Sequence, residues 1–378
     1  MLHIISSLAV GGAEQALYRV LKGGLATSFD NRVVSLKSHG AFSEKIREVG
    51  VQVDALGAGH PIASFFAIKD LYDIVQEFSP DIIQGWMYHG NFVARIAWRM
   101  TRDQSHLVWN VRHSLYDLAD EKLFTRQVIR ANRYWSPEVS TIIYNSRLSN
   151  VQHEKFGFRP ESGVVIPNGF DMSVHFSSAA NNFNVRDELS IPHSALVVGH
   201  VGRYHPVKNH EGFLRAVAEI IGDRKDVHVI LAGRGVDSGN DKLVNLLPKA
   251  VRDRVYFLGE RSDVPRLMCA MDLLCVSSFS EAFPNVLAEA MATGIPCVST
   301  NVGDSAIIIG DEGLLAKAND SSDFLNCLQS MLAMTGSDRR AMGQRARCRI
   351  EKFYSLGGVV EKYTGLYLSL LAQEVRKA

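Results

Sequence analysis

Two carboxylates, Glu281 and Glu289, frame the segment Ser280–Met291, whose later residues are apolar enough for a buried helix. Pro284 suits the first turn of that helix, because a proline has no N–H to leave unpaired there. The free backbone N–H groups of Asn285–Leu287 would then favour a bound phosphate. The two acids could accept hydrogen bonds from hydroxyl groups at two places on one extended ligand. The alternative is an acidic helix N-terminus favoured by the macrodipole, with Glu289 on a solvated face.

Two fixed cations form the second signal. An apolar run ends at Gly202, and Arg203 and Lys208 follow in a predicted loop. Arginine binds phosphate through a bidentate fork and lysine acts as a point charge. Both could stabilise the charge that develops on a phosphate leaving group, and losing one such donor typically costs about 3–4 kcal/mol of transition-state stabilisation. Two ordinary surface cations ahead of a helix are the competing interpretation.

Paired glycines, Gly11 and Gly12, lie between a predicted first strand and first helix. Glycines let the backbone approach a ligand closely, and a helix N-terminus favours an anion. The spacing is not G-x-G-x-x-G, so a dinucleotide-binding fingerprint is missing. A tight turn without a ligand is the alternative.

The elements that must position these loops alternate between apolar runs and helical periodicity. The predicted strands are 2–6, 32–36, 51–54, 81–84, 107–110, 141–144 and 164–166, then 195–201, 227–231, 255–258, 273–276 and 296–299. The predicted helices are 13–25, 65–78, 91–100 and 122–134, then 209–221, 242–247, 264–271 and 285–293. Such alternation predicts βαβ units and parallel sheets, with ligands at the carboxyl ends of the strands.

The chain length of 378 residues suits two domains. The small polar stretch 177–182 interrupts the alternation. We therefore expect an α/β protein with a first Rossmann-like domain at 1–172, a linker at 173–194 and a second Rossmann-like domain at 195–352. A C-terminal helix at 353–378 is expected to cross back to the first domain.

Composition excludes several classes of protein. The formal net charge of +1 gives no reason to expect a nucleic-acid partner. None of the five cysteines forms a C-x-x-C pair, so a zinc ribbon or disulfide framework is not expected, and a reduced cytoplasmic compartment is favoured. The N-terminus lacks the basic region of a signal peptide, and no apolar run of 18 residues suggests a membrane-spanning helix.

The glycine pair at 11–12, the cation segment at 203–208 and the segment Ser280–Met291 occur in this order along the chain. Together they resemble segments of the retaining glycosyltransferases of glycosyltransferase family 4, which have the GT-B fold. Ile166–Asp171 resembles the family's segment entering the interdomain linker, and Asn301–Ser305 and Gly313–Leu315 resemble late donor-domain loops. The resemblance covers nearly the whole chain. It implies two parallel sheets facing across a cleft and transfer of a sugar from a nucleotide-sugar donor.

The resemblance also implies roles for individual residues. Arg203 and Lys208 would bind the donor pyrophosphate, Glu281 would lie at the transferred sugar and Glu289 at the ribose. His113 would join Glu281, Arg203 and Lys208 as a catalytic group. The implied donor site comprises Gly12, Gly202, Arg203, Lys208, Glu281, Ala282, Phe283, Pro284, Asn285, Val286, Leu287 and Glu289.

The acceptor side is expected at loops that follow strands of the first domain. Asn110–Ser114 follows one strand, and the resemblance places His113 of this segment near the sugar. Arg112 and His89, the latter in the segment Trp86–Asn91, are the other acceptor candidates. A histidine satisfied in the core or at the surface, and packing of Trp86–Asn91 under a helix, are the alternatives.

No D-x-D pair stands out, and the resemblance implies no essential metal and no cofactor, with cations and helix dipoles in the place of a metal. It implies transfer with retention on one face of the sugar, with a transient covalent adduct as the alternative. We expect UDP rather than GDP in the donor. The expected acceptor is a glycan or lipid-linked saccharide of bacterial surface polysaccharide, such as lipopolysaccharide.

Arg126, Arg130 and Arg133 recur at helical spacing beside aromatic residues. This pattern predicts peripheral contact with an anionic membrane, at the inner face of the cytoplasmic membrane, and a solvated helix face is the alternative.

Three other functions compete with transfer. A nucleotide-sugar 2-epimerase would share the architecture, and a non-catalytic nucleotide-sugar-binding protein is disfavoured by the intact Glu281, Arg203 and Lys208. A dehydrogenase is disfavoured by the missing glycine fingerprint.

Overall fold

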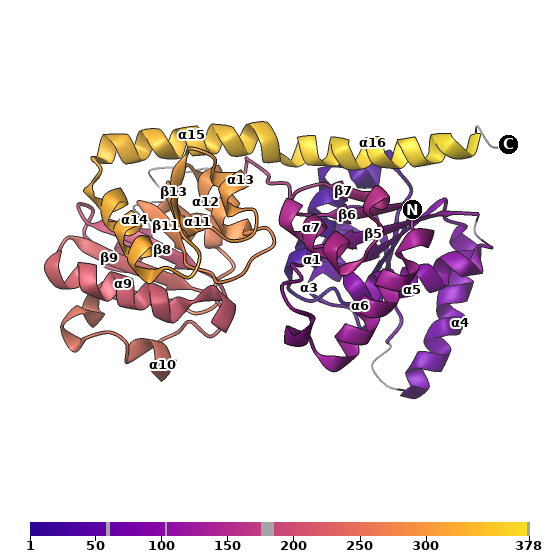
Figure 1. The fold of residues 1–378 in the computed structure, drawn as a ribbon, viewed down its shortest axis with the longest axis horizontal. Coiled ribbons are helices and arrows are strands. Elements are labelled where there is room, and N and C mark those ends of the chain that lie inside the picture. The colour runs from indigo at the N-terminus through magenta and orange to yellow at the C-terminus, as the bar shows by residue number, and fades with distance from the viewer. Residues whose placement is uncertain (58–60, 103, 175–184, 376–378) are drawn as a thin grey trace. The chain divides into compact units, whose positions relative to one another are not determined.

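The computed structural model describes residues 1–57, 61–102, 104–174 and 185–375, without the side chains of 61–66 and 373–375. The chain divides into two compact units. One comprises Met1–Gly169 together with Leu356–Ala378, and the other comprises Phe170–Ser355. Each unit is a parallel sheet with helices on both of its faces (Figure 1).

The first unit contains a seven-stranded parallel sheet in the order β3-β2-β1-β4-β5-β6-β7. Its strands are β1 (Leu2–Ile5), β2 (Arg32–Ser35), β3 (Gln52–Ala55), β4 (Ile82–Trp86), β5 (His106–Val111), β6 (Thr141–Tyr144) and β7 (Gly163–Val165). Its main helices are α1 (Gly12–Val20), α3 (Ala41–Glu48), α4 (Pro61–Phe78), α5 (Met87–Met100), α6 (Leu123–Trp135), α7 (Arg147–Phe156) and α16 (Leu356–Val375). A π-helical turn, η1 (Leu21–Leu25), continues α1.

Two apolar clusters cover the faces of this sheet. One joins α1, α3 and α16 to the sheet, and the other joins α4, α5 and α6. The inner strands are buried on both faces and are therefore mostly apolar, whereas the edge strands β3 and β7 are partly exposed. Tyr363 and Tyr367 of α16 are fully buried in the first cluster, so this C-terminal helix is part of the core.

The second unit contains a six-stranded parallel sheet in the order β10-β9-β8-β11-β12-β13. Its strands are β8 (Leu196–Val201), β9 (Val227–Ala232), β10 (Val255–Phe257), β11 (Leu273–Val276), β12 (Cys297–Thr300) and β13 (Gly313–Ala316). Its helices are α9 (His210–Asp223), α10 (Asp241–Val244), α11 (Val264–Cys269), α12 (Asn285–Thr293), α13 (Ser305–Ile309), α14 (Ser321–Ala333) and α15 (Gly336–Tyr354).

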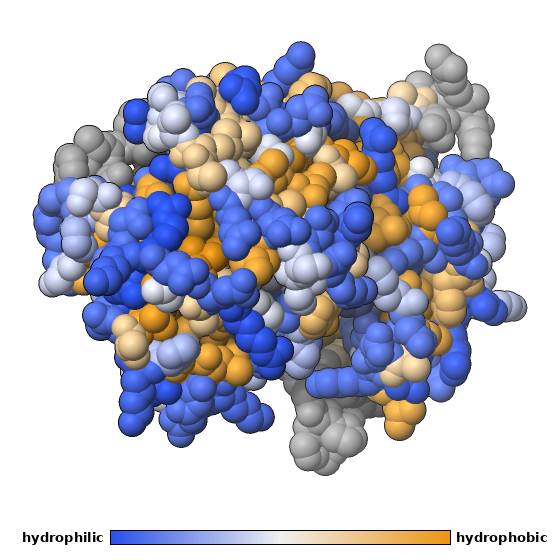
Figure 2. Space-filling view, turned by 60° about the vertical axis from the view of Figure 1, so that its left-hand side comes forward, coloured by the Kyte–Doolittle hydropathy of each residue, from blue (hydrophilic) through white to orange (hydrophobic). Residues whose placement is uncertain are grey.

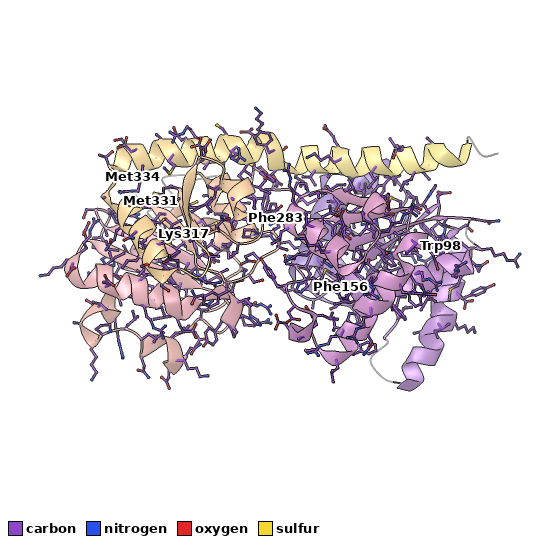
Figure 3. All side chains as sticks on the ribbon, viewed as in Figure 1. Trp98, Phe156, Phe283, Lys317, Met331 and Met334 are labelled. Carbon is purple, nitrogen blue, oxygen red and sulfur yellow. The ribbon has the colours of Figure 1, made fainter. Side chains whose placement is uncertain are left out.

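Aromatic packing holds α12 of this unit in place. Phe283, just before α12, stacks on Phe170 with ring centroids 6.1 Å apart and meets the edge of Tyr354 at 5.7 Å. Figure 3 shows Phe283 among the side chains of this unit, with Met331 and Met334 elsewhere in it. Met331 belongs to the apolar cluster on the other face of the sheet.

In each sheet the strand order reverses at one position. The reversal lies between β1 and β4 in the first sheet and between β8 and β11 in the second. Loops that leave the carboxyl ends of such strand pairs diverge to opposite faces and leave a crevice for ligands. In the second unit these loops are 202–209 and 277–284, which contain the predicted cations and Glu281.

Every predicted strand is present, with its ends shifted by two residues or fewer. The prediction of a doubly wound α/β fold is confirmed. Several helix boundaries were wrong: α4 begins at Pro61 instead of residue 65, α5 begins at Met87 instead of residue 91, and α10 ends at Val244 instead of residue 247. No loop separates β4 from α5, because Met87 itself turns the chain with φ of 64°. The predictions also missed strand β13 and helices α3 and α7.

The division of the chain differs from the predicted boundaries. Residues 185–194, predicted as linker, pack into the second unit, where Val185 and Ile191 are in its core. Residues 175–184 lie outside the described part. At the other end the second unit extends to Ser355, because α15 continues to Tyr354 and α16 begins at Leu356.

Surface composition is mixed. In Figure 2, hydrophobic residues reach the visible face in separate patches among hydrophilic ones. Across the part of the chain that is described, no helix has both the length and the apolar character needed to cross a bilayer.

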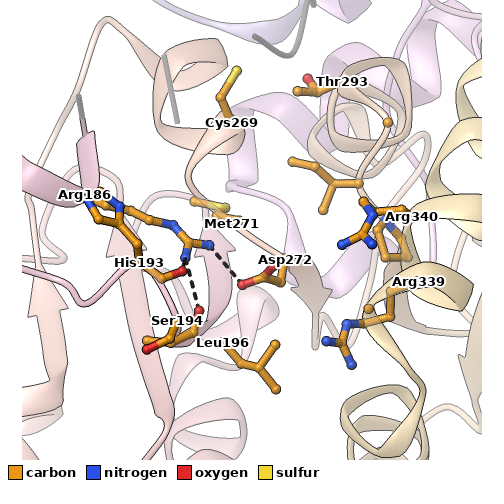
Figure 4. A pocket seen from close by; sticks show the side chains of 15 residues that line it. Arg186, His193, Ser194, Leu196, Cys269, Met271, Asp272, Thr293, Arg339 and Arg340 are labelled. Carbon is orange, nitrogen blue, oxygen red and sulfur yellow. Dashed lines mark hydrogen bonds and ion pairs between the residues drawn. The ribbon is translucent and has the colours of Figure 1, made fainter. Parts of the chain in front are cut away.

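A pocket of about 350 Å³ lies at the amino ends of β8, β11 and β12. Figure 4 shows Arg186 extending toward Asp272, with Arg339 and Arg340 on the opposite wall. The Arg186 guanidinium donates to Asp272 at 2.9 Å and to the carbonyls of Ala270 and Ala195. Asp272 in turn accepts the N–H of Val197 at 2.7 Å. This ion pair ties residues before β8 to the start of β11.

Replacing Asp272 by alanine should destabilise the second unit. Arg186 is only 6 % exposed, so its charge would lose its carboxylate partner in a buried position. We expect a loss of about 3 kcal/mol in the free energy of unfolding, measured by urea denaturation. The matched control is Asp187→Ala, because Asp187 is exposed and pairs only with the half-exposed His193. Equal losses in both variants would contradict the assigned importance of the buried pair.

Buried neutral histidines make the first unit sensitive to acid. Burial lowers the pKa of His3 to about 3 and that of His153 to about 4. The unfolded chain takes up these protons near pH 6.5, so stability is complete above that pH and falls as the pH drops toward the folded values. At pH 5 each histidine should cost about 2 kcal/mol relative to pH 7.5.

Urea denaturation at pH 7.5 and pH 5 measures this effect. His3→Gln should lower stability at pH 7.5 and flatten the dependence on pH, whereas His39→Gln, at an exposed position, should leave the dependence unchanged. A His3→Gln variant as sensitive to pH as the natural chain would refute the assignment.

Candidate functional site

The loops after β8 and β11 meet through an ion pair. Lys208 Nζ lies 2.5 Å from Glu281 Oε1, and Ser278 Oγ donates to the same carboxylate oxygen at 2.7 Å. The side chains of Lys208 and Glu281 are 23 % and 12 % exposed. The structure therefore brings together two residues that are far apart in sequence and that were predicted as site residues.

Arg203 lies in the same loop and its side chain is exposed. The flanking backbone is fixed, because Gly202 N–H donates to Ala232 O and Tyr204 N–H donates to Arg234 O, both at 2.8 Å. Partial burial and the positive charges of Arg203 and Lys208 lower the pKa of His205. Both cations are thus close enough to act on the imidazole of His205. The loop 202–209 is therefore positively charged.

Helix α12 presents its N-terminus beside Glu281. Pro284 occupies the N-cap position, one residue earlier than the predicted first turn, and its own side chain provides no capping hydrogen bond. Leu287 N–H donates to Pro284 O at 3.1 Å, so this amide is already paired, contrary to the prediction. Asn285 and Val286 begin the helix and are partly exposed, as is Glu289 in its second turn.

The loop after β12 also contacts the Glu281 segment. Gly303 has φ of 58°, and a Cβ there would lie 2.6 Å from the carbonyl oxygens of Glu281 and Ala282. Asp304 N–H donates to Ala282 O at 3.1 Å. Only glycine allows this close approach, which holds the backbone around Glu281 from a second side.

In the first unit, the corresponding loops carry the other predicted residues. Gly12 is the first residue of α1, and Gly11 precedes it in an extended conformation. Burial raises the pKa of Glu14 in the first turn of α1. At the other side of the strand reversal, Met87 adopts a left-handed conformation that is unusual for a residue with a side chain. Met87 Sδ accepts the N–H of Arg112 at 3.4 Å.

His113 forms a dyad with a carboxylate that the sequence predictions missed. Its Nε2 lies 2.6 Å from Glu121 Oε1, and its ring meets the edge of Tyr88 at 6.0 Å. The hydrogen bond from His113 lowers the pKa of Glu121. Arg126 holds the backbone here by donating to the carbonyls of Glu121 and Ala119. An oriented, half-exposed imidazole is equipped to bind a hydroxyl group or move a proton.

The remaining acceptor candidates have different surroundings. His89 stacks on Phe124 with centroids 5.6 Å apart, and burial with the charge of Lys37 lowers its pKa. Arg112 donates to Asn110 at 3.2 Å and to Tyr363 Oη at 3.3 Å. Arg112 is therefore partly committed to holding β5 against α16.

The predicted basic helix face is smaller than the sequence indicates. Arg126 is bound to backbone carbonyls, as described above, and Arg133 lies over the ring of Phe156 at 5.3 Å. Arg130 is exposed and contacts Gln127 at 3.5 Å. Of the three predicted arginines, Arg126 therefore has a structural role, while Arg130 and Arg133 are exposed.

Sequence reasoning missed Ser278 and Glu121. Ser278 stands three residues before Glu281, a spacing that suits a loop hydroxyl donating to the acid, and this signal was available. Glu121 stands eight residues after His113, and no regular element predicts their contact, because the intervening chain is mostly irregular.

Two family models match the chain. The model described as Glycosyltransferase Family 4 matches residues 10–174, and the model described as Glycosyl transferases group 1 matches residues 195–334. The first therefore covers the loops of the first unit, and the second covers the Lys208–Glu281 site.

Curated relatives include two bacterial enzymes. The N-acetyl-alpha-D-glucosaminyl L-malate synthase of Bacillus anthracis is 28% identical over 63% of this chain and 61% of its own length. The UDP-Gal:alpha-D-GlcNAc-diphosphoundecaprenol alpha-1,3-galactosyltransferase of Escherichia coli is 27% identical over 82% of this chain and 80% of its own length. The chain thus spans about three fifths of the first relative and four fifths of the second.

Solved structures show the same fold. HepE of Anabaena, solved in complex with UDP, superposes with a TM-score of 0.82 at 23% identity, over 97% of this chain and 99% of the HepE chain. Both parallel sheets are included in this match, since it covers nearly the whole chain. With a family 4 match in its first unit and a group 1 match in its second, the chain belongs to the glycosyltransferases of the GT-B fold.

Proposed function

We propose that this protein transfers a sugar, with retention of anomeric configuration, from a nucleoside diphosphate sugar to a saccharide acceptor. The observation that carries the proposal is the 2.5 Å contact of Lys208 with Glu281 at the strand reversal of the second sheet. A cation for phosphate and a carboxylate for sugar hydroxyls meet there, beside a helix N-terminus.

On this proposal the donor binds along the loops of the second unit. Arg203 and Lys208 neutralise the diphosphate as negative charge grows on it, and the start of α12 at Asn285 and Val286 adds its dipole. Glu281, held by Lys208 and Ser278, accepts hydrogen bonds from the sugar. Glu289, in the second turn of α12, is partly exposed and accepts hydrogen bonds from the ribose.

The loops of the first unit bind the acceptor. At Gly12 the start of α1 leaves its backbone accessible to a ligand, since a glycine has no side chain. His113, oriented by Glu121, binds a hydroxyl of the acceptor. His89 and Arg112 border this region.

Retention follows if the acceptor attacks the face that the diphosphate leaves. The bond from the anomeric carbon to the phosphate oxygen breaks first, giving an oxocarbenium-like state. The acceptor oxygen then bonds to the same face, and its proton passes to the departing phosphate oxygen. Cations and the helix dipole supply the charge stabilisation, so we propose that no metal or cofactor is required.

We propose UDP as the nucleotide and a lipid-linked or other glycan acceptor of bacterial surface polysaccharide. Two similar proteins support this choice: the E. coli relative uses UDP-Gal and a diphosphoundecaprenol-linked sugar, and HepE was solved with UDP-glucose.

Substitution of the paired residues tests the donor site. Glu281→Gln and Lys208→Ala should each lower kcat by about 10²–10³-fold, because each removes a charged group that acts on the transition state. The matched controls are Glu260→Gln and Lys249→Ala, two exposed positions of the same unit, which should keep full activity. Transfer is measured by mass spectrometry of products from a nucleotide-sugar panel with lipid-linked acceptors, with and without EDTA.

Several outcomes would contradict the proposal. Near-normal turnover in both site variants would remove the assigned roles of Lys208 and Glu281. Activity abolished by EDTA and restored by a metal would refute metal independence. Release of an altered free sugar without any acceptor would favour the nucleotide-sugar 2-epimerase instead.

A second candidate property is contact with an anionic membrane at the inner face of the cytoplasmic membrane. Three large apolar side chains of α6 face solvent: Leu123 is 74 % exposed, Phe124 72 % and Tyr134 78 %. Exposed basic residues, Lys122 and Arg130, accompany them. Apolar side chains that insert beside cations are the usual means by which a helix lies on a bilayer.

Sedimentation with vesicles tests this contact. The protein should bind vesicles containing anionic phosphatidylglycerol more tightly than neutral vesicles, and Leu123→Ser with Phe124→Ser should weaken binding at least about tenfold, because two apolar side chains that would insert into the bilayer are lost. The exposed Val151→Ser, on another helix, is the control. Equal partition of all variants into both vesicle types would exclude membrane contact through α6.

A further inference from the structure

Three buried polar residues lie behind the loop that carries Arg203 and Lys208. His200 is the next-to-last residue of β8, Ser277 directly follows β11, and His210 is the first residue of α9. Each is 3 % exposed or less. None of them was singled out as a site residue by the sequence, and none is placed to touch a ligand.

Ser277 binds the end of the loop. Its Oγ lies 3.1 Å from the carbonyl oxygen of Lys208 and 3.0 Å from that of Asn209. Carbonyl oxygens only accept, so the single hydroxyl proton of Ser277 is directed to them. His200 Nε2, 3.2 Å from the same Oγ, must then carry the hydrogen and donate it. Hydrogen bonds therefore connect His200 of β8, through Ser277 after β11, to the backbone of Lys208.

His210 binds the start of the loop. Its Nε2 lies 3.1 Å from Gly202 O, and since the carbonyl accepts, His210 donates through Nε2. The opposite side of this carbonyl is closed by Gly233, where a Cβ would lie only 2.0 Å away. The carbonyl that immediately precedes Arg203 is thereby held between an imidazole and a glycine.

A third bond fixes the loop between these points. Phe279 N–H, from the loop after β11, donates to Val207 O at 2.7 Å. The same loop carries Ser278 and Glu281. The end of the backbone segment on which Arg203 and Lys208 stand is therefore joined to the loop that carries Glu281, and its start is held by His210.

The buried pair of histidines makes the fold less stable than apolar side chains in the same place would. The Nδ1 atoms of both histidines are buried and have no hydrogen-bond partner within the described part of the chain. The two rings pack with centroids 4.5 Å apart. A buried polar atom without a partner lowers stability, because it loses its hydrogen bonds to water and gains none in the protein. Apolar side chains would fill the same space without this loss of stability. The imidazoles and the hydroxyl therefore contribute something else, namely their hydrogen bonds to the loop.

We propose that Ser277, His210 and His200 are positioning residues that hold the cation loop 202–209 in the geometry that grips a diphosphate. The inference rests on the proposed function for its consequence, because the held loop matters for nucleotide binding only if Arg203 and Lys208 meet phosphate. Ser277 acts on Lys208, and His210 acts on Arg203 through the carbonyl of Gly202. His200 acts through Ser277.

Hydrogen exchange measures the positioning directly. In Ser277→Ala and His210→Ala, the amides of residues 202–209 should exchange at least about tenfold faster, because each variant frees a backbone carbonyl of the loop. His210→Gln, whose amide nitrogen can replace Nε2 as a donor, and Ser277→Thr, which keeps the hydroxyl, should restore slow exchange. His228→Ala is the control, since His228 of β9 is also a buried histidine but contacts Tyr256.

Nucleotide affinity measures the consequence. Isothermal titration with UDP should show Kd raised about tenfold in Ser277→Ala, and Ser277→Ala should add little to Lys208→Ala, since both act through one group. In transfer assays Ser277→Ala and His210→Ala should lower kcat as well as raise KM, whereas a loss of stability alone would change neither in the folded fraction.

The two readouts separate the failure of each idea. Unchanged exchange in loop 202–209 in both alanine variants would overturn the positioning inference, as would strictly additive effects of Ser277→Ala and Lys208→Ala on UDP affinity. Faster exchange in a protein that binds neither UDP nor GDP would support positioning while refuting the proposed function. Faster exchange in His228→Ala of the same size would show general loosening and would overturn the inference.

Discussion

The contact between Lys208 and Glu281 is the interaction on which the candidate site of the second unit depends. Neither residue could hold its position alone, because a lysine has four rotatable bonds and a loop glutamate has no regular element to fix it. The parallel sheet supplies the geometry: β8 and β11 are neighbours with helices on opposite faces, so their following loops separate and leave a crevice. Ser278 and Gly303 then fix the Glu281 segment from two sides.

Much of this arrangement could be predicted from the sequence. Apolar runs flanked by helical periodicity give the strands almost to the residue, because buried parallel strands must be apolar on both faces. The edge of the sheet that carries the site was also predictable, since ligands are expected at the carboxyl ends of the strands. The cations at Arg203 and Lys208 and the acid at Glu281 follow from residue type and from family resemblance together.

Other features could not be predicted, because they depend on contacts between distant segments. The start of α5 at Met87 relies on a left-handed residue, which local propensity opposes. Glu121 meets His113 through irregular chain, and no periodicity anticipates the contact. Arg126 was expected to face outward with its neighbours, yet it binds two backbone carbonyls at the start of its own helix. A pattern of charged residues predicts which side chains share one face of a helix. It does not predict which of them are already bonded to other groups of the protein.

The place of α16 has a consequence for how the protein is made. The first unit begins at Met1, yet its core needs Tyr363 and Tyr367, which bind Asn110 and Gln84 of the sheet. During synthesis, the seven strands emerge from the ribosome long before α16 does. The intervening unit, Phe170–Ser355, is continuous and can complete its own core first. Residues 1–169 must therefore wait with an open apolar face, which closes only when α16 has left the ribosome.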